Sequence, residues 1–209
     1  MRTLPLSTTA KRQPLAALAT LCGLLSLLFC NVLHRLEHEM AKRLPNPWLR
    51  AVVGGTALVG LSLLFPSGAY NGIGSAVIEQ AVEGGEAVPW AFLLKILFTS
   101  LTLAAGFKGG EVVPCFFIGA TFGCAVGPLL GIPAGFAAAV GLISVFCGAV
   151  NCPLASILLS VELFGAEYLP LFGLSCAISY TLSGYFGLYG TQKILYSKIK
   201  TKYINRFTE

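Results

Sequence analysis

A glycine-rich segment in the middle of the chain has the residue types of an anion site. Residues 106–114 read GFKGGEVVP, and the sequence on either side is apolar. Glycine lets a ligand approach the main chain closely, and Pro114 suits the first turn of a following helix. The first N–H groups of a helix have no partner inside it and carry the positive end of the helix dipole. The segment therefore predicts a helix start that holds an anion.

Five polar side chains in or near this segment have two interpretations each. Lys108 either raises the local potential for anions or simply reaches water from a loop. Thr99 and Thr102, on the apolar stretch before the segment, either line an ion path or hydrogen-bond their own helix. Glu111 is either a proton carrier or a carboxylate that interacts with the helix dipole, and we favour the second. Lys95, deeper in the same apolar stretch, is expected to snorkel or to pair rather than to bind substrate.

The composition is that of an integral membrane protein. Of the 209 residues, 56% are hydrophobic and 11% are charged, whereas a soluble domain carries about 25% charge. The net charge of +5 is clustered in loops and in the C-terminal tail, so we attribute it to membrane topology and not to nucleic-acid binding. The seven cysteines lie at irregular spacing in apolar runs, which indicates neither disulfides nor zinc. Nothing indicates a cofactor.

Apolar runs of membrane-spanning length occur along most of the sequence. At roughly 20 residues per crossing, they predict six or seven spanning or half-spanning helices, among them 15–33, 51–65, 88–105, 113–130, 132–149 and 168–186. Two shorter helices are expected at 73–81 and 152–161. Gly119, Gly123 and Gly127 recur every fourth residue, and this stripe of small residues should let another helix approach closely.

The basic residues predict the domain organisation and the topology. A polar segment, 1–13, precedes a membrane domain that spans 14–209, and residues 190–209 form an amphipathic end rich in lysine. Positive loops tend to stay in the cytoplasm. We therefore place both the loop after residue 33 and the C-terminal end there, in a multi-pass protein of a bacterial-type plasma membrane, in contact with lipid.

Three stretches, taken in order, are similar to a known family. Residues 109–120 (GGEVVPCFFIGA) resemble the second-half anion-filter motif of the CLC chloride channels and transporters. Residues 151–162 (NCPLASILLSVE) look like a later helix of that family, and Leu188 with Tyr189 looks like the approach to its anion-coordinating tyrosine. The resemblance covers the chain from about residue 14. It implies an all-α integral membrane protein with broken, tilted helices, the second inverted repeat of the CLC fold.

The resemblance also implies a set of anion-binding residues. The main-chain N–H groups of Glu111 and Val112, in the motif that includes Gly109, Gly110 and Pro114, are expected to coordinate a dehydrated halide. A tyrosine hydroxyl is expected to be a further donor. Tyr189 is the first choice, because we expect it in the loop that enters the last helix, and Tyr196 is the alternative.

The implied function is halide transport, in a voltage-gated chloride channel or a proton-coupled antiporter. Glu111 replaces the family's usual apolar residue, and GFKGGEV looks like the bacterial branch that exports fluoride in exchange for protons. A homodimer is expected through helices near 153–163 and 169–185. The motifs of the family's first half, including its gating glutamate, have no counterpart in the sequence. An incomplete, non-transporting membrane fragment is therefore the alternative.

One short motif suggests an enzyme instead. His34, Glu37 and His38 fit the H-x-x-E-H arrangement of a class of zinc peptidases, in which two imidazoles and a carboxylate share a helix face. The motif lies where a membrane helix meets a basic loop, and short motifs often match by chance. We therefore regard a membrane-bound zinc peptidase as the less favoured interpretation and expect no enzymatic activity.

Overall fold

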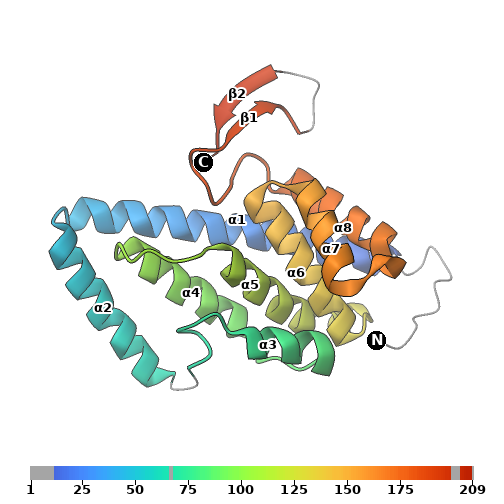
Figure 1. Ribbon diagram of the computed structural model, residues 1–209, viewed down its shortest axis with the longest axis horizontal. Helices are drawn as coiled ribbons and strands as arrows, with labels where there is room; N and C mark the ends of the chain where they lie inside the picture. The colour runs from blue at the N-terminus through green and yellow to red at the C-terminus, as the bar shows by residue number, and fades with distance from the viewer. Residues whose placement is uncertain (1–11, 66–67, 199–202, 209) are drawn as a thin grey trace.

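One long helix, α1, lies along the helical body and contacts helices from most of the remaining chain (Figure 1). The structure is a computed structural model, and it describes residues 12–65, 68–198 and 203–208. Its α-helices are α1 (Arg12–Arg43), α2 (Pro47–Leu64), α3 (Ser75–Glu79), α4 (Ala91–Ala104), α5 (Val112–Val126), α6 (Ala134–Val150), α7 (Pro153–Phe164) and α8 (Leu169–Leu182). Short π and 3₁₀ segments are η2 (Gln80–Gly84), η3 (Pro128–Leu130) and η4 (Ala166–Tyr168).

Local sequence signals explain where several helices begin and end. Asn46 caps α2 by accepting a hydrogen bond from the Trp48 N–H (3.0 Å), and Pro47 follows in the first turn. Pro153 occupies the same position at the start of α7. Asn151 ends α6 in the left-handed region, with φ 58°, a conformation that Asn tolerates better than most residues.

The glycine stripe packs α5 directly against the backbone of α6, as the sequence predicts. A Cβ at Gly119 would overlap the carbonyl of Gly141, and a Cβ at Gly123 would overlap the carbonyl of Ala137. Both helices are largely buried along this contact. Because the two backbones touch, the position of α5 is set by main-chain atoms and not by adjustable side chains.

The buried core lies where α1, α6 and α8 meet. Leu18, Cys22 and Phe29 of α1 are fully buried. The Ser179 hydroxyl of α8 donates to the Ser144 carbonyl of α6 at 2.6 Å, so the apolar contact contains paired polar groups. The cysteines carry free thiols, all buried except the half-buried Cys152.

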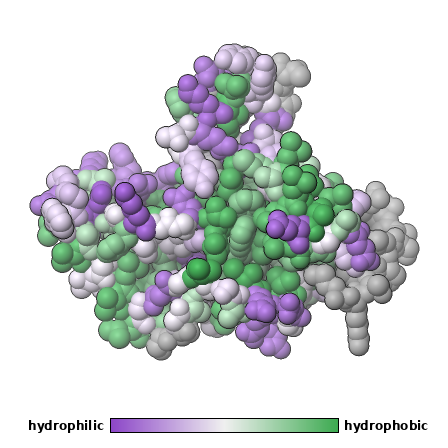
Figure 2. Space-filling view, viewed as in Figure 1, coloured by the Kyte–Doolittle hydropathy of each residue, from purple (hydrophilic) through white to green (hydrophobic). Residues whose placement is uncertain are grey.

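Two helices in the described part of the chain are long and apolar enough to cross a membrane, Gln13–Arg43 and Pro47–Leu64. Four shorter apolar helices accompany them: α4, α5, α6 and α7. The runs expected to be continuous at 113–130 and 168–186 are shorter in the structure, because α5 ends at Val126 before η3 and α8 covers only Leu169–Leu182. α2 exposes Val52, Val59 and Leu63, and apolar residues cover much of the helical body (Figure 2).

The C-terminal end differs from the expectation. The helix predicted after Tyr189 is a strand in the structure: β1 (Lys193–Tyr196) pairs antiparallel with β2 (Tyr203–Phe207). This hairpin projects from the helical body in Figure 1. Its apolar and basic residues alternate over so short a run that a helix and a strand are hard to distinguish from pattern alone. Tyr196 and Tyr203 pair across the strands, with ring centroids 5.7 Å apart.

The contact between α5 and α6 predicts that Gly123→Ala destabilises the protein. The added methyl group meets the Ala137 carbonyl, and overpacking of this kind costs about 1–3 kcal/mol. We expect a lower thermal unfolding midpoint in detergent. Gly173→Ala on α8, where a Cβ meets nothing within 4 Å, is the control. Equal stability of the two variants would contradict the packing described above.

Candidate functional site

The predicted glycine-rich segment is an open loop that ends in an uncapped helix start. Residues 107–110 have no regular structure, and α5 begins at Val112. Glu111 occupies the N-cap position, but its side chain makes no capping hydrogen bond. Within the described residues, the first backbone hydrogen bond into α5 runs from the Cys115 N–H to the Glu111 carbonyl, at 3.4 Å. Among the described residues, the amides of Glu111, Val112 and Val113 donate no backbone hydrogen bond and so remain available to a ligand.

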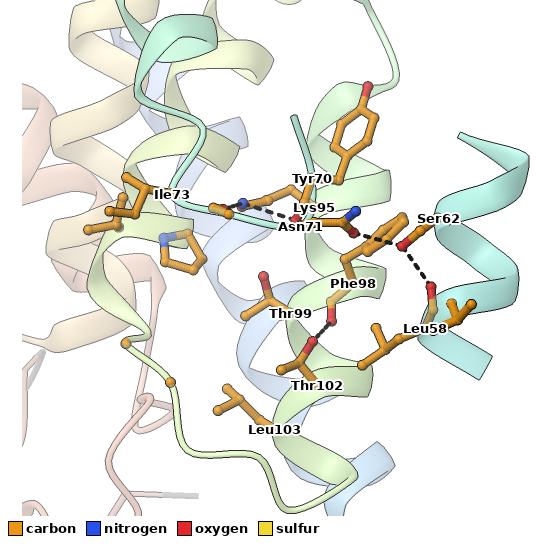
Figure 3. A pocket seen from close by; sticks show the side chains of 16 residues that line it. Leu58, Ser62, Tyr70, Asn71, Ile73, Lys95, Phe98, Thr99, Thr102 and Leu103 are labelled. Carbon is orange, nitrogen blue, oxygen red and sulfur yellow. Dashed lines mark hydrogen bonds between the residues drawn. The ribbon is translucent and has the colours of Figure 1, made fainter. Parts of the chain in front are cut away.

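A cavity of about 670 Å³ lies in front of this helix start. Gly109, Gly110, Val113 and Pro114 form its wall on the α5 side. The other walls come from α2, α4 and the loop that precedes α3 (Figure 3). The cavity therefore brings together five predicted residues: Gly109, Gly110, Pro114, Thr99 and Thr102.

Lys95 places a buried positive charge beside the cavity. Its side chain leaves α4, and its ammonium group donates hydrogen bonds to the carbonyls of Gly72 (2.5 Å) and Tyr70 (3.3 Å). The same group lies 4.9 Å from the ring centroid of Phe117 on α5, within cation–π distance. Lys95 is only 2% exposed, so of the two expected arrangements, snorkelling or pairing, the structure shows pairing, with main-chain carbonyls as the partners.

Hydroxyl and amide groups line the rest of the cavity. The Thr102 hydroxyl donates to the Phe98 carbonyl at 2.7 Å, which is the backbone pairing that the sequence left open. Thr99 lies one turn earlier on the same helix (Figure 3). Ser62 of α2 is 2.9 Å from the side-chain oxygen of Asn71. Ser62 and Asn71 were not singled out by the sequence, because neither lies in a motif.

Glu111 is not among the residues that line the cavity. One of its carboxylate oxygens is buried without a hydrogen-bond partner among the described residues. Burial raises the pKa of the Glu111 carboxyl, the negative charge of Glu37 raises it further, and His34 lowers it. Glu111 thus adds an acidic group to the predicted site, at the N-cap position of α5.

Tyr189 lies in the loop after α8, where the charge of Glu111 acts on its phenol. Burial, and then the negative charge of Glu111, raise the pKa of the Tyr189 phenol, so its hydroxyl keeps the proton that a hydrogen-bond donor needs. Its loop is fixed by three elements: His34 Nε2 bonds the Gly187 carbonyl (2.8 Å), the Leu188 N–H donates to the Ala149 carbonyl (2.9 Å), and the Thr208 hydroxyl contacts the Tyr189 carbonyl.

The remaining candidates lie outside the cavity. Tyr196 is 67% exposed on the hairpin, where it packs against Tyr203. Lys108 is exposed in the loop. The two candidate tyrosines thus differ in position. The charge of Glu111 acts on the Tyr189 phenol, whereas Tyr196 lies on the exposed hairpin.

Comparison with known proteins decides the family. The voltage-gated chloride channel family matches residues 6–184. The chain belongs to this family. A chloride/fluoride channel protein of Pseudomonas syringae pv. tomato is 40% identical over 182 residues, which are 84% of this chain and 40% of the relative. The H(+)/Cl(-) exchange transporter ClcA of Yersinia pestis is 27% identical over 159 residues, 70% of this chain and 33% of that protein.

Solved structures agree with this assignment. The crystal structure of a CLC-type fluoride/proton antiporter matches 90% of the chain with a TM-score of 0.85 and 34% identity, and the match covers 48% of that antiporter. The mostly helical CLC fold expected from the sequence is therefore confirmed, and the chain is an integral membrane protein of a transporter and channel family. The chain spans less than half the length of the relatives it matches.

The enzyme interpretation loses its main support. In the described residues, no group of three or more His, Cys, Asp or Glu side chains is placed to hold a metal ion. The family consists of transporters and channels and not of peptidases. His34 of the suspected zinc motif bonds the Gly187 carbonyl instead.

Lys95→Met should loosen the loop before α3 without unfolding the helices. Removing the ammonium group removes two hydrogen bonds to the Tyr70 and Gly72 carbonyls, and a hydrogen bond to a charged group contributes about 1.5–3 kcal/mol. We expect faster amide hydrogen exchange across residues 68–74, with exchange in α6 unchanged. Lys95→Arg should restore much of the protection. Unchanged exchange in Lys95→Met would show that the ammonium does not hold this loop.

Proposed function

We propose that this chain forms part of a halide transporter in which the start of α5 binds the anion. The observation that supports the proposal best is the cavity in front of an uncapped helix start, walled by Gly109, Gly110, Val113 and Pro114. Unpaired amides at a helix N-terminus attract anions because they combine hydrogen-bond donors with the positive end of the dipole. We propose the N–H groups of Glu111 and Val112 as ligands.

Electrostatics explains why an anion enters this part of a membrane. An ion that leaves water loses its hydration shell, and main-chain donors replace that shell without carrying a full opposing charge. Lys95 adds a positive charge at the cavity, while its two carbonyl partners keep the buried ammonium satisfied. The cavity thus offers net positive potential, together with the hydroxyl groups of Thr99 and Thr102.

The substrate we propose is a small halide, fluoride or chloride, carried with protons in the opposite direction. The relatives with the higher identities are named a chloride/fluoride channel protein and a CLC-type fluoride/proton antiporter. The carboxyl group of Glu111 belongs to the same residue as one of the proposed amide ligands, so we now favour the proton carrier among the two roles that the sequence suggested for Glu111. Flux of fluoride and chloride from liposomes, recorded together with pH, tests the exchange.

We propose a multi-pass orientation in a bacterial plasma membrane, with the basic loop after α1 in the cytoplasm. A homodimer through α7 and α8 completes the proposal. α7 exposes Leu154, Leu158 and Leu163 on the outside of the helical body. Such a contiguous apolar surface is typical of a contact with lipid or with a second copy, and the resemblance to the family favours the second copy.

Tyr189→Phe should weaken halide binding and leave the fold intact. The substitution removes only the hydroxyl, and a hydrogen bond to a charged group contributes about 1.5–3 kcal/mol, so Kd rises roughly tenfold or more. Calorimetric titration with fluoride and chloride measures the change. Tyr196→Phe, on the exposed hairpin, is the matched variant and should bind as the wild type does. The opposite ranking would assign the donor role to Tyr196.

The dimer proposal predicts that Leu158→Trp shifts the protein toward monomer. Leu158 is 71% exposed on α7, and an indole there is too large for a tightly packed helix interface but is tolerated by lipid. Light scattering in detergent measures the mass. Leu63→Trp on α2, where the leucine is 77% exposed, is the control and should leave the mass unchanged. A mass that responds to Leu63→Trp and not to Leu158→Trp would place the contact on α2.

A further inference from the structure

The ammonium group of Lys198 lies where two helices end. Lys198 follows β1, and its side chain donates hydrogen bonds to the Tyr180 carbonyl (2.9 Å) and the Ser183 hydroxyl (2.8 Å) at the end of α8. It also donates to the side-chain oxygen of Asn151, the residue that ends α6. The same ammonium group lies 4.1 Å from the ring centroid of Tyr180, within cation–π distance. Oxygen atoms from two helix ends and one aromatic face therefore hold this cation.

The two helix ends explain why a lysine is bound at this point. The last carbonyl groups of a helix have no partner inside it and carry the negative end of the helix dipole. Tyr180 lies in the last turn of α8, and Ser183 is the C-cap residue of that helix. A lysine side chain stabilises such an end by donating to its carbonyls. Lys198 does so from a segment that lies beyond the helix and the loop after it, so it ties the C-terminal hairpin to the helical body.

Asn151 connects this lysine to the loop that carries Tyr189. Its side-chain oxygen accepts from Lys198, while its side-chain N–H donates to the Phe186 carbonyl at 2.8 Å. An amide side chain that uses both of its ends in this way holds one orientation. Close by along the chain, the Tyr185 hydroxyl donates to the hydroxyl of Ser197, the residue before Lys198, at 2.9 Å. The first part of the loop is thus attached to the hairpin at 185–186.

Thr208, the residue after β2, attaches the second part of the same loop. Its hydroxyl donates to the Tyr189 carbonyl, and its N–H donates to the Gln192 carbonyl at 3.0 Å. Thr208 is buried, and a Cβ at Gly187 would lie 3.2 Å from its methyl group. The loop therefore packs closely on Thr208. The hairpin contacts the loop on both sides of Tyr189 in the sequence.

We propose that the C-terminal hairpin is a clamp that positions the Tyr189 hydroxyl for the anion, with Lys198 and Thr208 as its two ends. The Tyr189 side chain is 42% exposed, so neighbouring side chains hold its ring only in part, and the backbone of its loop determines where the hydroxyl lies. Lys198 and Thr208 are positioning residues, which act through the loop and not on the anion. This inference rests on the proposed function, because it takes Tyr189 as a donor to the halide.

Fluorine NMR of protein labelled with fluorotyrosine tests the clamp without halide. The Tyr189 signal is identified by its loss in Tyr189→Phe. It should shift or broaden in Lys198→Met, which keeps the side-chain length and removes the ammonium group, and in Thr208→Val, which removes only the hydroxyl. Lys193→Met is the matched control and should leave the signal unchanged, because Lys193 is exposed on β1 and its ammonium group lies over the Phe207 ring of the same hairpin. An unchanged signal in both clamp variants would overturn the proposal.

Halide titration separates positioning from general stabilisation. Lys198→Met should raise the halide Kd toward the roughly tenfold increase expected for Tyr189→Phe, because a displaced hydroxyl loses no more than an absent one. Added to Tyr189→Phe, Lys198→Met should raise Kd no further, since both substitutions act on one hydrogen bond. Lys198→Arg, which keeps a cation with hydrogen-bond donors, should restore part of the affinity. Should Lys198→Met fail to fold, Thr208→Val provides the same comparison from the other end of the clamp.

Two results of the titration would count against the clamp. Independent effects of Lys198→Met and Tyr189→Phe in the double variant, or an equal loss of affinity in Lys193→Met, would show that the hairpin stabilises the protein without positioning the tyrosine. A failure of the proposed function looks different. If the wild type binds no halide while the Tyr189 signal still depends on Lys198 and Thr208, the halide site is wrong and the clamp on the loop stands.

Discussion

A helix that begins inside an apolar protein leaves its first amides without partners, and this constraint governs the centre of the structure. α5 begins at Val112 with no side-chain cap, and its position cannot relax because its glycines touch the backbone of α6. The unsatisfied amides must therefore be met by a ligand or by water in the cavity ahead of them. The open loop leaves this helix end uncapped, and the cavity gives a ligand room in front of it.

Positive and negative groups meet around one loop. Lys95, Gly109 and Gly110 line the cavity, whereas the charges of His34 and Glu37 of α1 act on the Glu111 carboxyl. In the transporter that we propose, the anion binds main-chain amides and the proton binds a carboxylate, so the two ions use different atoms. Such an arrangement lets the binding of one ion change the affinity for the other.

Local signals in the sequence predicted the features that depend on few residues. The open loop, the start of α5 near Pro114 and the glycine stripe follow from backbone conformation and from side-chain size, which a short stretch specifies. The site residues that the sequence missed, Ser62 and Asn71, meet only through the packing of α2 against the next loop. The action of the His34 charge on Glu111 likewise depends on how α1 crosses α5. The hairpin was missed because its strands are short and their pattern fits a helix as well.

Lys95 has a consequence for the way the chain enters a lipid bilayer. A lone ammonium group in hydrocarbon is unstable, yet α4 carries it at a buried position whose only hydrogen-bond acceptors, in the described residues, are main-chain carbonyls of the preceding loop. That loop leaves the ribosome before α4 does. Insertion of α4 is therefore coupled to docking of the loop against it, and the two segments enter the membrane as one unit.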